Sequence, residues 1–385
     1  MKKTTCIASL MVCLSMGQAG AFAQNIRIDM NKTYPEKTIS LQKVADVKYI
    51  PLETTDEVLF NGVVTHLSAE GIAGFNKKEG DILVFDGTGK AIASFNHTGQ
   101  GPNEYNKIYH LDVNWKQKEV YVQDNFRQKI RIYALNGSHL RTIDLQETMQ
   151  QGDLYNFSDT HLIYYAQLKS KPVTPYEPVT LLTKKDASKA TLPFTKTDDN
   201  LVKATGGPFG DMKMSAKNVN LLCKKGNQVY VNEVTADVIY RVESNHALTP
   251  VVQRTPSYQD ASGQDFFLML TGANARYYFF KRQQALLEFQ GNAATDTKST
   301  YVAYDRKEKQ LLNPTFTNED YPSQDIPMSK LLQCAGSANR CYLQLEAFKL
   351  KEALAEGKLK GTLKSIAEKL DEEDNPVLMV VEFKK

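Results

Sequence analysis

The sequence lacks an excess of charge of either sign. Its 385 residues contain 47 Lys and Arg against 44 Asp and Glu, so the formal net charge is +3. Binding of nucleic acid through bulk charge needs a clear basic excess, and we therefore expect no nucleic-acid partner. After residue 23, no stretch approaches the ~18 consecutive apolar residues of a membrane-spanning helix. We therefore expect no transmembrane segment.

Compact catalytic and metal-binding motifs are also missing. The six histidines show neither HxxxH nor HExxH spacing, and there is no CxxC pair. The chain has no GxSxG elbow and no DxDxDG calcium loop. We therefore expect no cofactor, no metal ligand and no catalytic residue that a local motif could reveal. A site assembled from distant parts of the chain would leave no such motif, so catalysis stays open as an alternative.

The first 23 residues have the pattern of a signal peptide. Two lysines precede the apolar run Ile7–Met16, and Ala21 and Ala23 place small residues where signal peptidase reads them. We predict cleavage before Gln24 and export to the periplasm or the cell exterior. Lipidation of Cys13 is the less favoured alternative, because the residue before it is not small.

Cysteine is scarce, with five in the chain and three in the expected mature part. Disulfides persist in exported compartments. Cys334 and Cys341 flank a short flexible segment that could turn back on itself, so we predict a disulfide between them. Cys223 follows two leucines and is expected to be a buried strand residue.

The sequence does contain a repeated β-hairpin. Ile82–Lys90 and Ile130–Ser138 align without a gap, which places the turn glycines Gly89 and Gly137 48 residues apart. This spacing is typical of the blades of a β-propeller. Looser copies follow at Val179–Lys184 with Ala190–Phe194, Val238–Val242 with Ala247–Val252, and Tyr301–Asp305 with Gln310–Phe316.

The two ends of the chain predict how the ring closes. Val47–Leu52 and Val377–Phe383 each have a strand pattern but no local hairpin partner. Pairing them in a sixth blade would remove two open sheet edges. We therefore predict an all-β protein, in which residues 24–385 form one six-bladed β-propeller, and we expect it to be a monomer.

About 60 residues per blade exceed the usual ~40–50, so insertions are expected. Phe348–Leu354 and Leu359–Leu370 have helical spacing and are divided by Gly357, which predicts two small amphipathic helices near the C-terminus. A second insertion is expected at Tyr258–Gly272, where Phe266–Leu270 is compatible with a short helix.

Three motifs carry a resemblance to a known family. Gly99–Tyr105 reads GQGPNEY, Tyr49–Thr54 reads YIPLET and Glu373–Leu378 reads EDNPVL. The chain resembles a six-bladed β-propeller family of exported proteins from Bacteroides-type bacteria, in which the first motif is GxGPGEY. Here Asn103 replaces the third glycine of that motif. The resemblance implies an extracytoplasmic propeller with NHL-like repeats, and it implies no particular activity.

The loop Gly99–Tyr105 is the first candidate for ligand binding. It joins one blade to the next, and such connections lie on the face where a propeller admits ligands. The candidate residues are Gln100, Asn103, Glu104 and Tyr105. The alternative is a purely structural turn, since two glycines and a proline within four residues suit a fixed backbone shape.

Two matched strands supply the remaining candidates. Glu119–Asp124 and Gln228–Glu233 fit the inner strands of blades, and each ends in polar residues. Equivalent strand ends converge on one face of the ring, which adds Asp124, Arg127, Asn232 and Glu233 as candidates for ligand contact. The alternative is an ordinary turn between strands. Gly206–Gly210 is a further loop expected at this face.

Two functions are compatible with these observations. We favour an exported binding protein whose ligand is a carbohydrate, a peptide or another envelope protein, because compact catalytic motifs are missing and 19 tyrosines suit stacking on sugars and filling interfaces. The alternative is a propeller enzyme of the lactonase or lyase type, with a metal in the central channel. That enzyme would need Asp, Glu, Asn or His from at least three blades in the channel.

Overall fold

The computed structural model describes residues 26–124, 126–145, 154–165, 177–195, 201–205, 212–215, 221–258, 260, 266–290, 293–294 and 298–385. For the strands at 201–205, 212–215, 286–290 and 293–294, only the course of the backbone is described. The expected signal peptide, its cleavage site before Gln24 and the loop Gly206–Gly210 lie outside the described residues.

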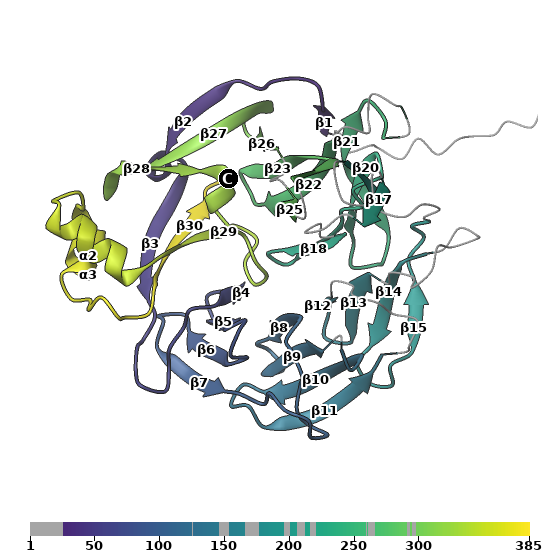
Figure 1. Cartoon of the computed structure of the whole chain (residues 1–385), viewed down its shortest axis with the longest axis horizontal. Helices are drawn as coiled ribbons and strands as arrows, with labels where there is room; N and C mark the ends of the chain where they lie inside the picture. The colour runs from purple at the N-terminus through teal and green to yellow at the C-terminus, as the bar shows by residue number, and fades with distance from the viewer. Residues whose placement is uncertain are drawn as a thin grey trace, which may run out of the picture.

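Six β-sheets surround a central axis as the blades of a propeller (Figure 1). In the first three blades, four consecutive strands pair in antiparallel order. The first strand of each lies nearest the axis and the last lies at the outer edge, so each connection between blades returns from the edge to the axis. This arrangement confirms the predicted all-β, six-bladed architecture.

The strands of the first four blades follow the chain in order. Blade 1 contains β4 (Val63–Leu67), β5 (Gly71–Phe75), β6 (Ile82–Asp86) and β7 (Ala91–Phe95). Blade 2 contains β8 (His110–Asn114), β9 (Glu119–Asp124), β10 (Lys129–Ala134) and β11 (His139–Asp144). Blade 3 contains β12 (Leu154–Asn156), β13 (His161–Tyr165), β14 (Val179–Thr183) and β15 (Lys189–Thr191). Blade 4 contains β18 (Leu222–Lys225), β19 (Gln228–Val231), β20 (Val238–Val242) and β21 (Leu248–Thr255).

The last two blades contain strands from distant parts of the chain. Blade 5 contains β22 (Phe266–Ala273), β23 (Tyr277–Gln284), β26 (Ser299–Asp305) and β27 (Gln310–Asn318), and β28 (Tyr321–Pro327) pairs with β27. Blade 6 contains β29 (Arg340–Leu345), β30 (Val377–Phe383) and β3 (Ala45–Pro51). A separate sheet contains β16 (Leu201–Thr205), β17 (Met212–Ser215), β24 (Leu286–Gln290) and β25 (Ala293–Ala294).

The turn glycines of the repeated hairpins adopt the backbone that the sequence predicts. Gly89 has φ +93° and Gly137 has φ +86°, a region that side chains with a Cβ rarely enter. The matched strands β9 and β19 are each second from the axis, however, because β8 and β18 lie inside them. They are therefore not the inner strands that we expected.

An N-terminal strap runs along the outside of two blades before the chain enters the sixth (Figure 1). We use this name for β1 (Ile26–Asp29) and β2 (Glu36–Ser40), which pair in parallel with β21 and β27. Between them, the Met30 N–H donates to the carbonyl of Thr255 at 2.7 Å. The strap covers the outer edges of blades 4 and 5, which would otherwise be open to pairing with other chains.

The N- and C-terminal strands close the ring in blade 6. The short helix α1 (Leu41–Val44) leads into β3, which pairs antiparallel with β30 so that Ile50 lies opposite Leu378. This is the pairing that the sequence predicts. The motifs at both ends also bond to each other, since the Asn375 side chain donates to the carbonyl of Glu53 at 2.7 Å and accepts from the Phe60 N–H at 2.6 Å.

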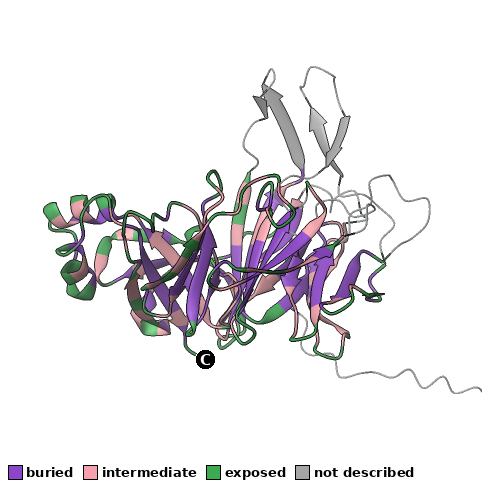
Figure 2. Cartoon of the chain, turned by 90° about the horizontal axis from the view of Figure 1, so that it is seen from below, coloured by how far each residue is buried: buried purple, intermediate pink, exposed green. Residues whose placement is uncertain are grey.

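Two helices lie in the connection between β29 and β30, as predicted. They are α2 (Ala347–Ala355) and α3 (Gly361–Ala367), at one side of the ring, and both expose their outer faces (Figures 1 and 2). Leu350 and Leu363 are buried in the core between blades 5 and 6. Among the described residues, no helix is long and apolar enough to cross a membrane.

The short helix expected within Phe266–Leu270 is wrong. These residues belong to β22, the inner strand of blade 5, which pairs antiparallel with β23. Phe267, Leu268 and Leu270 are all buried. An apolar run of this length fits a fully buried strand as well as a helix, and here the pairing partner β23 decides in favour of the strand.

The core of the protein lies between neighbouring blades. Between blades 1 and 2, for example, Ala73 and Val84 pack with Leu111, Val120 and Tyr133 in one buried cluster. Buried strands consequently stand side by side around the ring (Figure 2). Because each blade buries both of its faces, the middle strands read as continuous apolar runs and not as alternating patterns.

The segment before β29 serves as the inner strand of blade 6 and crosses to other blades. Leu332 and Tyr342 donate to each other's carbonyls at 2.9 and 2.7 Å. Further along, Ala335 forms parallel bridges with both His66 of blade 1 and Gly226 of blade 4. Backbone hydrogen bonds therefore join blades 1, 4 and 6 directly at the axis.

Candidate functional site

The loop Gly99–Tyr105 is held by one arginine side chain. The guanidinium of Arg127 donates to the carbonyls of Gly101 and Gly99 at 3.0 Å each and to the Gln100 side-chain oxygen at 2.7 Å. A planar guanidinium offers several donors in a fixed fork, so it can fix three loop oxygens together. Arg127 and Gln100, both predicted ligand-contact residues, thus bind each other.

Glu104 and Tyr105 complete the internal bonding of this loop. The Glu104 carboxylate accepts the Gly101 N–H at 2.7 Å, and a Cβ at Gly99 would lie only 2.0 Å from that carboxylate. Tyr105 is fully buried, and its hydroxyl donates to the carbonyl of Gly80 at 2.8 Å. A side chain at position 99 would therefore displace the Glu104 carboxylate from this place.

Asn103 also takes part in this internal bonding through its backbone. The hydroxyl of Tyr133 donates to the Asn103 carbonyl at 2.6 Å. The backbone role explains why asparagine can stand where the resembling family has glycine. For this loop, the described contacts support the structural alternative.

The polar ends of β9 and β19, which were predicted as ligand contacts, are buried and bond to protein groups. Asp124 is fully buried and lies 3.1 Å from the guanidinium of Arg131, which is only 1% exposed. The Asn232 side chain accepts the Leu270 N–H of blade 5 at 3.0 Å, and Glu233 accepts a hydrogen bond from Tyr165 of blade 3. The end of β19 thus contacts neighbouring blades, whereas Asp124 is paired within its own blade.

The disulfide expected between Cys334 and Cys341 is not formed in the structure. Both are free cysteines, and Cys223 is buried in β18 as expected. Cys341 packs in the core between blades 5 and 6, whereas Cys334 packs against the core between blades 6 and 1. The two side chains lie on opposite faces of blade 6, because the bridge from Leu332 to Tyr342 offsets them by one residue.

Polar groups from four blades, three side chains and one backbone segment, meet at the axis. Asp112 of blade 2 is fully buried, and its carboxylate lies 3.0 Å from the ammonium of Lys224 and 3.6 Å from Nδ1 of His66. The same carboxylate accepts the backbone N–H of Asn156 at 2.7 Å. We call His66, Asp112, Asn156 and Lys224 the axial cluster.

Burial and neighbouring charges at the axis shift the pKa values of two groups, Asp112 and His110. Burial alone would raise the pKa of Asp112, but Lys224 and His66 outweigh burial and hold it well below its usual range. His110 stands at the start of the same strand, and burial lowers its pKa to about 4. Near neutral pH, the axis therefore contains an ionised Asp112 carboxylate and a neutral His110 imidazole.

The axial cluster fastens inner strands to one another. Lys224 also donates to the carbonyl of Asn156 at 2.8 Å, so it joins blades 2, 3 and 4. The sequence analysis missed this cluster. One signal was present, since His66 and Asp112 interrupt apolar strands and a buried polar group needs a partner.

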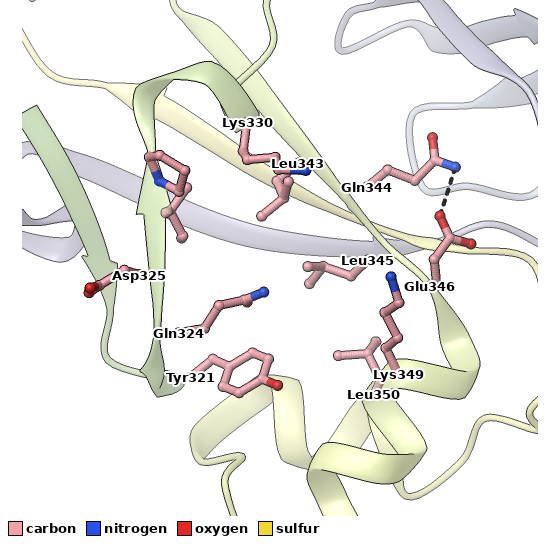
Figure 3. Close-up of a pocket in the computed structure, with 12 residues that line it drawn as sticks. Tyr321, Gln324, Asp325, Lys330, Leu343, Gln344, Leu345, Glu346, Lys349 and Leu350 are labelled. Carbon is pink, nitrogen blue, oxygen red and sulfur yellow. Dashed lines mark hydrogen bonds between the residues drawn. The ribbon is translucent and has the colours of Figure 1, made fainter. Parts of the chain in front are cut away.

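A groove opens between blades 5 and 6, beside the helices (Figure 3). It has a volume of about 350 Å³. Its walls are β28 with the following 3-10 turn η2 (Met328–Lys330), the end of β29 and the start of α2. The lining residues are Tyr321, Gln324, Asp325, Ile326, Pro327, Lys330, Leu343, Gln344, Leu345, Glu346, Lys349 and Leu350.

The groove is built on a buried base. Ile326 of β28, Leu345 of β29 and Leu350 of α2 belong to the same core cluster. β28 is fixed by antiparallel pairing with β27, in which Ile326 lies opposite Phe316. The three walls are thus held by shared packing, which favours a preformed site.

The groove and the loop Gly99–Tyr105 share one face of the ring. We call this the connector face, since it is the side on which the outer strand of one blade is joined to the inner strand of the next. The loop lies between β7 and β8, and the segment of β28 and η2 lies between β27 and the inner strand of blade 6. No residue that lines the groove was a candidate in the sequence analysis.

The groove combines an aromatic ring with amide and charged groups. Tyr321 stands beside Gln324, whose amide is directed into the cavity (Figure 3). Lys330 and Lys349 approach from opposite sides. Within the described ranges, no three His, Cys, Asp or Glu side chains are grouped as ligands of a metal ion would be.

The fold is similar to that of two solved Bacteroides proteins. A Bacteroides fragilis protein that is predicted to be exported has a TM-score of 0.61 and 14% identity, over 94% of this chain and 99% of its own. A DUF4221 family member from Bacteroides vulgatus has a TM-score of 0.51 and 9% identity, over 89% and 98%. At these identities the likeness shows the fold alone.

A family comparison covers almost the whole chain. No curated protein matches it. The family described as domain of unknown function DUF4934 matches residues 25–382, a span that includes the strap and all six blades. The chain therefore belongs to the DUF4934 family.

Proposed function

We propose that this protein is an exported binding protein that takes a carbohydrate in the groove between blades 5 and 6. The observation that carries the proposal is a cavity of about 350 Å³ in which Tyr321 and Gln324 stand over a base of leucines. Ligand pockets have volumes of about 300–1,000 Å³ and combine apolar walls with a few directed polar groups.

The chemistry of the lining favours a sugar over a purely apolar ligand. A tyrosine ring can cover the C–H face of a sugar while its hydroxyl bonds to solvent or ligand. The amide of Gln324 can both donate to and accept from hydroxyl groups. A peptide or another envelope protein remains the competing ligand class, and the test below includes both.

The export part of the proposal rests on the signal-peptide pattern of the first 23 residues and on the fold shared with a Bacteroides fragilis protein that is predicted to be exported. Periplasm and cell exterior are both compatible with it. The relation of the blades to NHL-like repeats is likewise part of the proposal, since it rests on the sequence resemblance.

The test is a titration of the mature protein, residues 24–385, with a panel of purified oligosaccharides, followed by thermal shift and calorimetry. Gln324→Ala and Tyr321→Ala are expected to weaken binding at least tenfold without preventing folding. Phe126→Ala is the matched control, because Phe126 is 75% exposed and lies in the turn between β9 and β10, away from the groove.

Two results would overturn the proposal. If the groove variants bind the selected sugar as tightly as the parent, the binding site lies elsewhere. If no sugar binds, while a peptide library or a purified envelope protein does, the ligand class is wrong.

A further inference from the structure

The cationic groups of the groove are directed differently from its acidic groups. The side chains of Lys330 and Lys349 extend toward the cavity, and the amide nitrogen of Gln324 also points into it (Figure 3). Neither lysine forms an ion pair with any residue that the structure describes. Three nitrogen donors therefore line the cavity, although the Lys349 ammonium also lies over the Phe348 ring, 5.5 Å from its centroid.

The acidic residues of the lining do not cancel this arrangement. Asp325 points away from the cavity (Figure 3). Glu346 accepts a hydrogen bond from the Gln344 side chain at 3.3 Å. The formal charges of the lining balance. With Asp325 directed away, two ammonium groups and one carboxylate remain at the rim of the cavity, and a charge acts most strongly at short range.

We propose that the ligand of the groove is a carboxylated saccharide, with the carboxylate placed between Lys330 and Lys349. This inference rests on the proposed carbohydrate function and names its ligand class. Ammonium groups donate strong hydrogen bonds to carboxylates. Gln324 is placed to bond to a hydroxyl group of the same sugar ring, and Tyr321 and Leu343 are the apolar surfaces for its C–H groups.

A saccharide is favoured over a peptide carboxylate by the shape and composition of the site. The cavity of about 350 Å³ is the size of a small ligand and not an extended channel. A peptide chain bound beside a sheet gains most of its affinity from a row of backbone hydrogen bonds. Here β28 contains two prolines, Pro322 and Pro327, which have no N–H to offer to such a row.

The experiment compares matched sugars that differ only in charge. Oligogalacturonate and the corresponding neutral galactose oligomer are titrated against the mature protein at low and at high salt. We expect the acidic sugar to bind at least tenfold more tightly at low salt, and we expect this preference to shrink as salt rises.

Single substitutions assign the preference to the two lysines. Lys330→Gln and Lys349→Gln are each expected to weaken binding of the acidic sugar about fivefold and to leave the neutral sugar unchanged. Lys369→Gln removes the same charge from an exposed position outside the groove and is the matched control. Lys349→Arg is expected to keep the preference, because it keeps the charge.

The outcomes separate this inference from the proposed function. If neutral and acidic sugars bind equally and Gln324→Ala weakens both, the carbohydrate function stands and the charge preference is wrong. If free carboxyl-terminal peptides bind in the groove and acidic sugars do not, the ligand is a peptide and both proposals fail. If Lys369→Gln weakens binding as much as Lys330→Gln, the effect is long-range attraction and the inference fails.

Discussion

Two connections in equivalent positions of the ring have opposite characters. The segment between blades 1 and 2 contains the loop Gly99–Tyr105, and the guanidinium of Arg127 bonds to three of its oxygens. The segment between blades 5 and 6 contains β28, which bends outward to pair with β27 and leaves a groove beside α2. Position in the fold alone therefore does not make a connection a binding site. What matters is whether its polar groups are already used by the protein.

Of the two connections, the one between blades 1 and 2 already uses its polar groups within the protein. We therefore expect the largest loss of stability from substitutions beside it. Asp124→Ala would leave the guanidinium of Arg131 buried without its carboxylate, and it would remove the acceptor for the Asn106 N–H. Loss of one partner of a buried pair costs about 3–5 kcal/mol, so we expect a fall of that size in the free energy of unfolding. Urea denaturation followed by circular dichroism measures it.

The double variant Asp124→Ala/Arg131→Met is the control for this prediction. It removes both charges together and is expected to be more stable than Asp124→Ala alone. If the losses of the two single variants simply add, the pair is not the source of the effect.

The connection between blades 1 and 2 leads into His110, the first residue of β8. We expect protonation of His110 to have the next largest effect on the free energy of unfolding. The pKa of His110 is about 4 in the folded protein, against about 6.5 in an unfolded chain. The unfolded state therefore binds a proton first as pH falls. We expect full stability well above pH ~6.5 and a progressive loss of about 3 kcal/mol as pH falls through ~6.5 to ~4.

The measurement is the free energy of unfolding of the parent and of His110→Phe across this pH range. The variant keeps an aromatic ring beside Tyr155, whose ring centroid lies 4.7 Å from that of His110. Its pH dependence should be shallower than that of the parent. Equal slopes would show that His110 does not carry the effect.

Arg127→Ala tests the loop Gly99–Tyr105 itself. The variant loses the hydrogen bonds to Gly99, Gln100 and Gly101, and we expect it to destabilise the protein by about 1–2 kcal/mol, since hydrogen bonds to charged groups are the stronger kind but this side chain is partly exposed. Arg127→Lys should recover little, because an ammonium group cannot reproduce the planar fork. Full recovery by lysine would contradict the proposed geometry.

The smallest effect on stability is expected in the open groove. Gln324→Ala should change the free energy of unfolding by less than about 0.5 kcal/mol, because a partly exposed side chain without a structural contact contributes little. The same urea titration compares it directly with Arg127→Ala. A loss as large as that of Arg127→Ala would show that the groove is as structural as the loop and would remove the contrast between them.

Elements with local signals were predicted well. The hairpins that turn at Gly89 and Gly137 contain short apolar strands and a glycine at a positive φ, both of which are properties of a few neighbouring residues. The helices α2 and α3 follow from helical spacing divided by Gly357. By contrast, Phe266–Leu270 has an apolar run without clear periodicity, and only its pairing with β23 makes it a strand.

The candidate site residues show why function was harder to predict than fold. Glu104, Tyr105 and Asp124 are polar residues at loops and strand ends, which is where ligand contacts are common. In the structure, their partners are Gly101, Gly80 and Arg131. Those pairings depend on three-dimensional packing, and the same residue types would serve equally in a ligand site.

The sequence by itself determined the six-bladed ring, the two terminal strands that close it and the two small helices. Each follows from short-range patterns of apolar residues and turn residues, together with two strands that lack a local partner. Only the tertiary structure decided the course of the strap, the axial cluster and the groove. These features join residues as distant as Ile26 and Val252, His66 and Asp112, or Tyr321 and Leu350. Their contacts arise from blade packing, and a local pattern contains no information about the partner across the interface.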